Sequence, residues 1–324
     1  MNPDLFLADL ERKPSALQAL AARLRSEDPW AFLGRAPERV VLLGMGSSAY
    51  AGGVAAARLR ARGMTAVSEL ASTDLLPAWG ADTLYVAVSA SGRSRETLAA
   101  LDRLPRGALV VGLTNTSSIG AVAAHTVSME AGAEEGGVAC RSFQHTLVLL
   151  AALEAHLAGE PLGRLADTVE QAAEASAHML ETAPEWLPVV TDLVAGPDGT
   201  HLAAPTRRLS SAQQGALMLR EGPRRFAVGC EAGDWAHVDV YLTKNTDYRL
   251  LVFAGSSWDD GIVEWTRPRG TTVVAVGGEF PDASATVRYP YDDLDDVRLL
   301  TETLVPELVA ARLWLDQAGP DPSG

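Results

Sequence analysis

Two turns in the first half of the chain carry residues suited to holding an anion. One, Gly44-Met45-Gly46-Ser47-Ser48, ends the apolar segment 39–48, and the other, Ser89-Ala90-Ser91-Gly92-Arg93-Ser94, follows the apolar segment that starts at residue 83. Glycine lets backbone N–H groups approach an anion closely, a following helix adds a positive dipole end, and serine hydroxyls add donors. This set predicts a phosphate monoester as ligand, with the candidate binding residues Gly46, Ser47, Ser48, Ser89, Ser91, Gly92 and Ser94.

A Gly-X-Gly pair after a strand also occurs in dinucleotide-binding folds. Here no third glycine stands at the spacing of Gly-X-Gly-X-X-Gly, and no Walker lysine is present. The pattern therefore disfavours a nucleotide-dependent oxidoreductase. A purely structural interpretation, in which each turn caps and packs a helix, stays open.

Strands and helices alternate along the chain, which predicts parallel sheets between layers of helices. We expect two similar α/β domains at 31–160 and 185–318, joined by a connecting helix at 161–184, with a helical leader at 1–30 broken near Pro14 and a tail at 319–324. The predicted strands are 39–48, 65–70, 83–91, 108–116, 126–130, 199–207, 248–257 and 271–278. The predicted helices are 49–63, 93–104, 141–158, 160–186, 210–221, 259–267 and 299–317.

Composition excludes several classes of partner. The chain has 324 residues and a net charge of −14, which would repel a nucleic acid. No apolar stretch is long enough to cross a membrane, and the N-terminus lacks the pattern of a secretory signal. Two cysteines cannot make a disulfide framework, so we expect reduced thiols and a cytoplasmic protein.

Several segments resemble the SIS (sugar isomerase) domain family. Residues 89–101 look like its Ser-X-Ser-Gly-X-Thr phosphate loop with the helix after it, and residues 131–143 are similar to its AGxE-x-G-V-A segment. Residues 6–17 resemble the helix before the isomerase half of glucosamine-6-phosphate synthase. The resemblance runs from about residue 5 to 318 and implies two SIS domains, each a flavodoxin-like α/β/α sandwich. No segment resembles the glutaminase domain of that synthase, so we do not expect glutamine hydrolysis.

The resemblance also implies roles for the site residues. Ser89, Ser91 and Ser94 would hold the phosphate, and Ser47 and Ser48 would line the sugar.

Two further residues come from the second half of the chain. Residues 216–221 match the family's ALKLKE helix, which puts Glu221 on the glutamate that moves a proton between C1 and C2. His237 aligns with the ring-opening histidine, which reaches the sugar from a neighbouring subunit. Structural alternatives are a solvated helix-end acid for Glu221 and a packed histidine for His237.

The sequence departs from the family at several positions. Met218 replaces a lysine, Ala90 replaces a frequent glutamine, and the tail lacks the family's C-terminal lysine. Lys13 and Lys244 are the only lysines and neither is at a motif position, so acid–base chemistry is expected rather than imine chemistry.

The second half holds a degraded counterpart of the phosphate loop at 254–261. Its Asp259 and Asp260 would repel a phosphate, so one phosphate site per chain is expected.

These features favour an enzyme acting on a hexose or aminohexose 6-phosphate, either an aldose–ketose isomerase or an aminosugar-phosphate deaminase. Glu221 and His237 would be catalytic, and no metal or organic cofactor is required because the carbonyl acidifies the migrating proton. The resemblance implies a homodimer with shared sites. The alternatives are a non-catalytic sugar-phosphate sensor and a fructosamine-6-phosphate deglycase.

Overall fold

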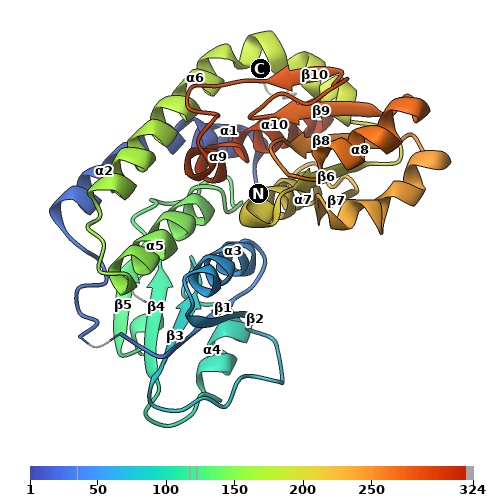
Figure 1. Ribbon diagram of the computed structural model, residues 1–324. Coiled ribbons are helices and arrows are strands. Elements are labelled where there is room, and N and C mark those ends of the chain that lie inside the picture. The colour runs from blue at the N-terminus through green and yellow to red at the C-terminus, as the bar shows by residue number, and fades with distance from the viewer. Residues whose placement is uncertain (35, 117, 122, 319–324) are drawn as a thin grey trace. The chain divides into compact units, whose positions relative to one another are not determined.

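The computed structural model describes residues 1–34, 36–116, 118–121 and 123–318 (Figure 1). The predicted tail at 319–324 lies outside these residues. Contacts divide the chain into two compact units that interleave in sequence. One unit comprises 16–133 and 141–170, and the other comprises 1–15, 134–140 and the chain from 171 onward.

The unit built around 16–133 contains a five-stranded sheet whose strands are all parallel, in the order β2-β1-β3-β4-β5. The strands are β1 (Arg39–Gly44), β2 (Thr65–Leu70), β3 (Thr83–Val88), β4 (Leu109–Thr114) and β5 (His125–Ser128). The helices are α2 (Lys13–Ser26), α3 (Ser47–Ala61), α4 (Arg95–Leu101), η1 (Ser118–Ala121) and α5 (Arg141–Leu157).

Helices cover both faces of this sheet because its strands are apolar on both sides. Val41 and Leu43 point to one face, where they form a buried cluster with Ala100 of α4. Leu42 points to the other face, where α3 approaches so closely that a Cβ on Gly52 would lie 3.4 Å from the Leu42 Cβ. The arrangement is an α/β/α sandwich.

The other unit contains a second five-stranded parallel sheet, in the order β10-β9-β8-β6-β7. Its strands are β6 (Thr200–Ala204), β7 (Ala227–Glu231), β8 (Arg249–Phe253), β9 (Thr272–Val276) and β10 (Ala285–Val287). The α-helices are α1 (Pro3–Glu11), α7 (Leu209–Glu221), α8 (Asp259–Thr266), α9 (Asp295–Thr301) and α10 (Leu304–Ala318). Short 3₁₀ helices are η2 (Thr206–Arg208), η3 (Asp234–Ala236), η4 (Asp239–Lys244) and η5 (Arg267–Arg269).

Helices cover both faces of the second sheet as well. Leu202 faces α7, where a Cβ on Gly215 would lie 2.7 Å from a Leu202 methyl carbon. Ala203 faces the opposite side, in a cluster with Trp235 of η3 and Ile262 of α8.

Both sheets have the same topology, since the second, read from β7, runs β7-β6-β8-β9-β10 and matches β2-β1-β3-β4-β5 strand for strand. The predicted fold class, two α/β/α sandwiches with parallel sheets, is therefore confirmed.

Several element boundaries differ from the sequence predictions. Strands β7 and β10 were not predicted, because β7 contains a glycine and β10 has only three residues. The connecting helix α6 spans Gly163–Val194 and passes through Pro184 and Pro188, whereas the sequence predicted an end near the first proline. The break near Pro14 is confirmed, since α1 ends at Glu11 and α2 begins at Lys13.

The predicted helix 299–317 is two helices, α9 and α10, separated at residues 302–303. The sequence carried a signal for this break that the prediction missed. The polar residues at 301–303 interrupt the apolar pattern, and Pro306 stands in the first turn of α10, where a helix tolerates proline.

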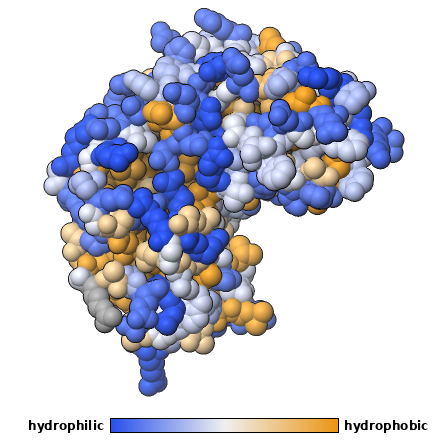
Figure 2. Space-filling model, in the orientation of Figure 1, coloured by the Kyte–Doolittle hydropathy of each residue, from blue (hydrophilic) through white to orange (hydrophobic). Residues whose placement is uncertain are grey.

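The visible surface is mostly polar (Figure 2), in keeping with a net charge of −14. Figure 2 shows mostly hydrophilic residues on the face seen in Figure 1, interrupted by smaller hydrophobic patches. Among the described residues, we find no helix whose length and apolarity would let it span a bilayer.

Candidate functional site

The two predicted turns lie side by side at the carboxyl edge of the first sheet. Strands β1 and β3 are hydrogen-bonded neighbours, and the strand order reverses between them. Open α/β sheets bind ligands in the crevice at such a switch point. The structure thus brings Gly46, Ser47 and Ser48 after β1 to the same edge as residues 89–94 after β3.

The first turn leads directly into α3. Gly46 caps this helix with φ 51° and ψ −126°, a conformation that glycine adopts readily and other residues avoid. Ser47 and Ser48 are the first two residues of the helix and are half-buried. The Ser48 N–H donates to the Met45 carbonyl at 3.1 Å. The serines therefore occupy the positive end of a 15-residue helix.

The second turn is tightly folded around Gly92. The Ser89 N–H donates to the Leu113 carbonyl at 3.0 Å, and the Gly92 N–H donates to the Ser89 carbonyl at 2.9 Å. Gly92 has φ 63°, and a Cβ there would lie 2.9 Å from the Thr116 Oγ1 atom. No other residue fits this position without strain.

The three serines of this turn differ in their surroundings. Ser89 is buried, Ser91 is exposed, and the Ser91 Oγ accepts a hydrogen bond from the Arg93 N–H at 3.2 Å. Ser94 caps α4, since its Oγ accepts from the Thr97 N–H at 3.3 Å and donates to Glu96 at 2.9 Å. A phosphate contact from Ser94 would have to replace or share these bonds.

Sequence reasoning missed the polar residues that brace this turn from the end of β4. The Thr116 hydroxyl donates to the Ser91 carbonyl at 2.9 Å. The Thr114 hydroxyl and the Asn115 N–H donate to the Ala90 carbonyl at 3.3 Å and 3.0 Å. The signal is present in the sequence, because a polar Thr-Asn-Thr run ends a buried strand, but the predicted strand 108–116 includes that run.

Glu221 ends α7 in the other unit and lines a cavity of about 290 Å³. Partial burial raises the pKa of the Glu221 carboxyl group above its ordinary value. The positive charge of Arg220 opposes this rise, and the negative charge of Glu134 adds to it. The remaining lining residues are Met1, Gly222, Arg224, Trp314, Gln317 and Ala318.

Part of the AGAEEGGVAC segment packs in the same unit as Glu221. The Gln214 side chain of α7 donates to the Ala139 carbonyl at 2.9 Å. Glu134 accepts a hydrogen bond from the Cys140 N–H at 2.6 Å, which folds residues 134–140 into a closed turn. This segment therefore lies along the helix that ends in Glu221.

His237 and Glu221 lie on elements that pack against opposite faces of the second sheet. The segment that carries His237 packs on the face of Ala203, because Trp235 belongs to the buried cluster that contains Ala203. Glu221 ends α7, which packs on the face of Leu202. The His237 side chain is exposed, and the sheet lies between its segment and the helix that ends in Glu221.

The two lysines differ in their surroundings. Lys13 is fully buried and forms an ion pair with Glu307 of α10. The Lys244 ammonium is exposed and lies 5.9 Å from the centre of the Tyr241 ring.

The edge of the second sheet that corresponds to the serine turns is filled by the chain's own charges. The Asp259 carboxylate accepts the N–H groups of Gly255 and Ser256 at 2.7 Å and 3.1 Å, where a ligand anion would otherwise bind. Arg207 and Arg208 are the third and fourth residues after the end of β6, as Ser47 and Ser48 are after the end of β1. The two arginines therefore replace the serine pair in the second sheet. Arg208 is buried, pairs with Glu302 and donates to the Ala254 carbonyl at 2.6 Å.

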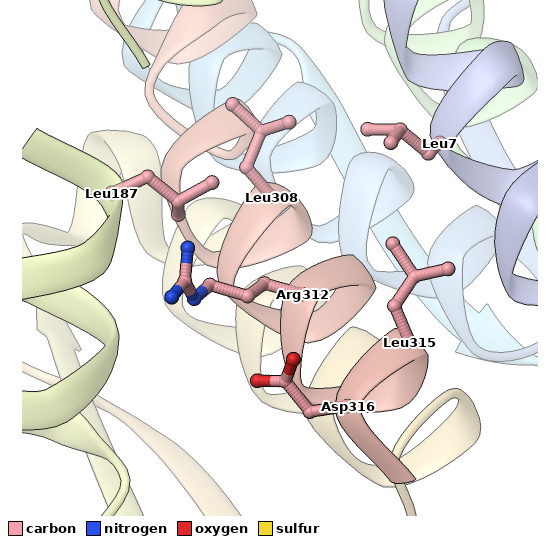
Figure 3. A pocket seen from close by; sticks show the side chains of 6 residues that line it. All are labelled: Leu7, Leu187, Leu308, Arg312, Leu315 and Asp316. Carbon is pink, nitrogen blue, oxygen red and sulfur yellow. The ribbon is translucent and has the colours of Figure 1, made fainter. Parts of the chain in front are cut away.

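A further cavity of about 310 Å³ contains none of the predicted site residues (Figure 3). Leu308, Arg312, Leu315 and Asp316 of α10 line it together with Leu7 of α1 and Leu187 of α6. Figure 3 shows the side chains of these four leucines together with those of Arg312 and Asp316.

Residues 35–155, which include both serine turns, match the family model described as "SIS domain". Residues 35–155 therefore form a SIS domain. The family resemblance of the serine-rich turns is thereby confirmed.

The chain is also similar to curated proteins and to proteins of solved structure. It is 28% identical over 294 residues to a glutamine–fructose-6-phosphate aminotransferase (isomerizing) from Aeropyrum pernix, covering 85% of this chain and 47% of that protein. The chain thus spans about half the length of that relative.

Among solved structures, the C-terminal domain of glucosamine-fructose-6-phosphate aminotransferase from Francisella tularensis superposes with a TM-score of 0.79 at 16% identity, covering 96% of each chain. Tagatose-6-phosphate ketose/aldose isomerase from Escherichia coli gives a TM-score of 0.79 at 16% identity, covering 98% of this chain and 95% of that one. At these identities the superpositions establish the shared fold.

Proposed function

We propose that the protein is a phosphosugar isomerase or an aminosugar-phosphate deaminase that acts on a hexose or aminohexose 6-phosphate. The observation that carries this proposal is the pairing of two serine-rich turns at the switch point of the SIS-domain sheet. Backbone N–H groups, hydroxyls and the α3 dipole at that edge suit a dianionic phosphate.

In the proposed reaction the phosphate anchors the sugar at Ser47, Ser48, Ser89, Ser91 and Ser94. Glu221 takes the proton from C2 or C1 and returns it to the neighbouring carbon through an enediol. Its raised pKa supports this role, because a base whose pKa lies closer to neutrality accepts a carbon-bound proton more readily.

His237 would open the sugar ring by moving a proton between the ring oxygen and the anomeric hydroxyl. Because the segments that carry His237 and Glu221 pack on opposite faces of one sheet, we propose that the histidine serves the site of a second copy in a homodimer. Exposed apolar side chains near His237, at Val238, Tyr241 and Leu242, support a protein contact there. With two unpaired cysteines, Cys140 and Cys230, we propose a cytoplasmic location.

The test is thermal stabilisation by a panel of sugar phosphates, followed by NMR in deuterated water on each ligand that binds. Glucose, fructose, tagatose and glucosamine 6-phosphates form the panel, with inorganic phosphate and the unphosphorylated sugars as controls. We expect a phosphorylated sugar to raise the melting temperature and to gain deuterium at C1 or C2. Release of ammonia would identify a deaminase, and release of an amino acid from a fructosamine 6-phosphate would identify a deglycase.

The matched variant is Glu221→Gln, which keeps the size of the side chain and removes the base. We expect it to bind the ligand with wild-type affinity and to lose at least 10³-fold in exchange, within the range of 10² to 10⁴ typical for general base catalysis. Binding without exchange in the wild-type protein would instead identify a sugar-phosphate sensor. The sequence features that would agree with a sensor are Met218 and Ala90, which replace a lysine and a frequent glutamine of the family pattern.

A further inference from the structure

His237 is an exposed residue between two anchored ones. Trp235, two positions before it, is fully buried, and Asp239, two positions after it, is 8% exposed. The Trp235 Nε1–H donates to the Tyr248 hydroxyl oxygen at 2.9 Å. The Tyr248 O–H in turn donates to Asp239 Oδ2 at 2.9 Å. A single phenol oxygen therefore ties down the chain on both sides of His237.

The carboxylate of Asp239 is held by more than Tyr248. His201 Nδ1 lies 3.1 Å from the same Oδ2, and because an ionised carboxylate only accepts, this nitrogen carries the proton. The Cys230 thiol lies 3.9 Å from this oxygen. Burial alone would raise the pKa of Asp239, but the hydrogen bonds from His201 and Tyr248 outweigh burial and lower the pKa. The buried negative charge is thus compensated.

Tyr248 is itself fixed to the sheet. It immediately precedes β8, and its ring belongs to the buried cluster that contains Trp235, Val240 and Leu250. The Tyr248 ring stacks on His201 of β6, with ring centres 4.1 Å apart and planes tilted by 24°. The anchor of the η3–η4 segment is therefore His201 of β6 together with the residue that leads directly into the neighbouring strand β8.

We propose that Tyr248 and Asp239 are positioning residues that aim the His237 imidazole. This inference rests on the proposed function, in which His237 opens the sugar ring. Short 3₁₀ helices hold their shape poorly by themselves, and the two hydrogen bonds to the Tyr248 oxygen fix the turn that carries His237. Tyr248 contacts no substrate in this proposal and acts only through the histidine.

Tyr248→Phe removes one oxygen and leaves the ring stack and the core volume in place. We expect turnover of a cyclic sugar phosphate to fall about 10- to 100-fold, since misplacing a catalytic group by about 1 Å has effects of that size. The readout specific to positioning uses 5-deoxyfructose 6-phosphate, which lacks the hydroxyl that closes the ring. Because this probe needs no ring opening, Tyr248→Phe and His237→Ala should exchange its C1 proton at the wild-type rate.

A double-mutant cycle completes the test. If Tyr248 acts through His237, the variant Tyr248→Phe/His237→Ala should turn over the cyclic substrate no more slowly than His237→Ala alone. Tyr291→Phe, which likewise removes a tyrosine hydroxyl that donates to a carboxylate, here that of Glu174 at 2.7 Å, should match the wild type throughout. Asp239→Ala, which removes the acceptor of the Tyr248 hydroxyl, supplies an independent variant and should show the same difference between the two substrates.

Two results would overturn the inference: equal loss on the cyclic and open-chain substrates, or additive losses in the double variant. Either would make Tyr248 a purely structural residue. Failure of the proposed function looks different. The wild-type protein would then show no exchange with either substrate, and failure of the His237 role alone would leave His237→Ala with wild-type turnover of the cyclic substrate.

Discussion

Glu221 illustrates how one side chain's surroundings set its chemistry. Partial burial and the charge of Glu134 both raise the pKa of its carboxyl group, and only Arg220 opposes them. A general base must be ionised to act, so activity is lost as the pH falls through that pKa. We therefore expect the acidic limb of the pH profile of kcat/KM to fall at a higher pH than the ordinary pKa of a glutamate.

The variant Glu134→Gln tests the cause of this shift. Removing a nearby negative charge favours the ionised form of Glu221, so the acidic limb should move to lower pH while the alkaline limb stays in place. Glu135→Gln, at the exposed neighbour in the same segment, is the matched control and should leave the profile unchanged. An unshifted limb in Glu134→Gln would show that another group controls it.

Single residues also mark where sequence reasoning reached its limit. The serine turns could be predicted, because glycine and serine after a buried strand have few structural reasons to be there. Asp239 could not, because its partners His201 and Tyr248 are 38 and 9 residues away, and no local pattern joins them.

At the scale of elements, the loop between β3 and α4 depends on the absence of a side chain at Gly92. Gly92→Ala would combine a positive φ of 63° with a Cβ 2.9 Å from the Thr116 hydroxyl oxygen and 3.1 Å from that of Thr114. We expect a loss of about 1–3 kcal/mol in the free energy of unfolding and a weaker affinity for the sugar phosphate.

Gly107→Ala separates backbone strain from the local clash. Gly107 has φ 82°, and a Cβ there would meet no atom within 4 Å. An alanine at this position would therefore carry a similar backbone strain without contacting the loop between β3 and α4. Urea denaturation should show both variants destabilised, whereas titration calorimetry should show weaker ligand binding in Gly92→Ala alone. Equal affinities in the two variants would show that the loop tolerates a side chain at Gly92.

The contact between the start of α2 and α10 rests on a buried ion pair. Lys13 and Glu307 are both fully buried, and burial raises the pKa of Glu307 even though Lys13 opposes it. Lys13→Met leaves a buried carboxyl group without its cation, and we expect a loss of about 3–5 kcal/mol in the free energy of unfolding.

Replacing both partners, as in Lys13→Met/Glu307→Leu, should recover most of that stability, because no buried charge remains to be compensated. Urea denaturation of the wild type, both single variants and the double variant would give the coupling between the two side chains. A double variant as unstable as the sum of the single ones would show that the pair adds packing rather than charge compensation.

At the scale of the whole molecule, the sequence predicted the repeated α/β rhythm but not every strand. A parallel sheet buries both faces of its strands, so apolar runs such as 39–44 are easy to recognise. The edge strands β7 and β10 escaped prediction because they have short, mixed sequences that only pairing with β6 and β9 makes into strands. The order of the strands, and with it the switch point, became visible only in the structure.

The repeated topology gives the chain two positions where a phosphate could bind, and we expect one of them to be closed. In the second sheet the Asp259 carboxylate already occupies the N–H groups of Gly255 and Ser256. A phosphate would have to displace that carboxylate and meet the negative charge of Asp260. Titration calorimetry with the sugar phosphate that binds should therefore give one site per chain.

Matched serine variants locate that site. Ser89→Ala/Ser91→Ala should abolish binding, because these residues belong to the open turn after β3. Ser256→Ala/Ser257→Ala, in the corresponding turn after β8, should bind as the wild type does, since Asp259 already closes that turn. Two results would show that both sheets have kept a phosphate site. One is a stoichiometry of two sites per chain. The other is residual binding in Ser89→Ala/Ser91→Ala that is lost when Ser256→Ala/Ser257→Ala is added.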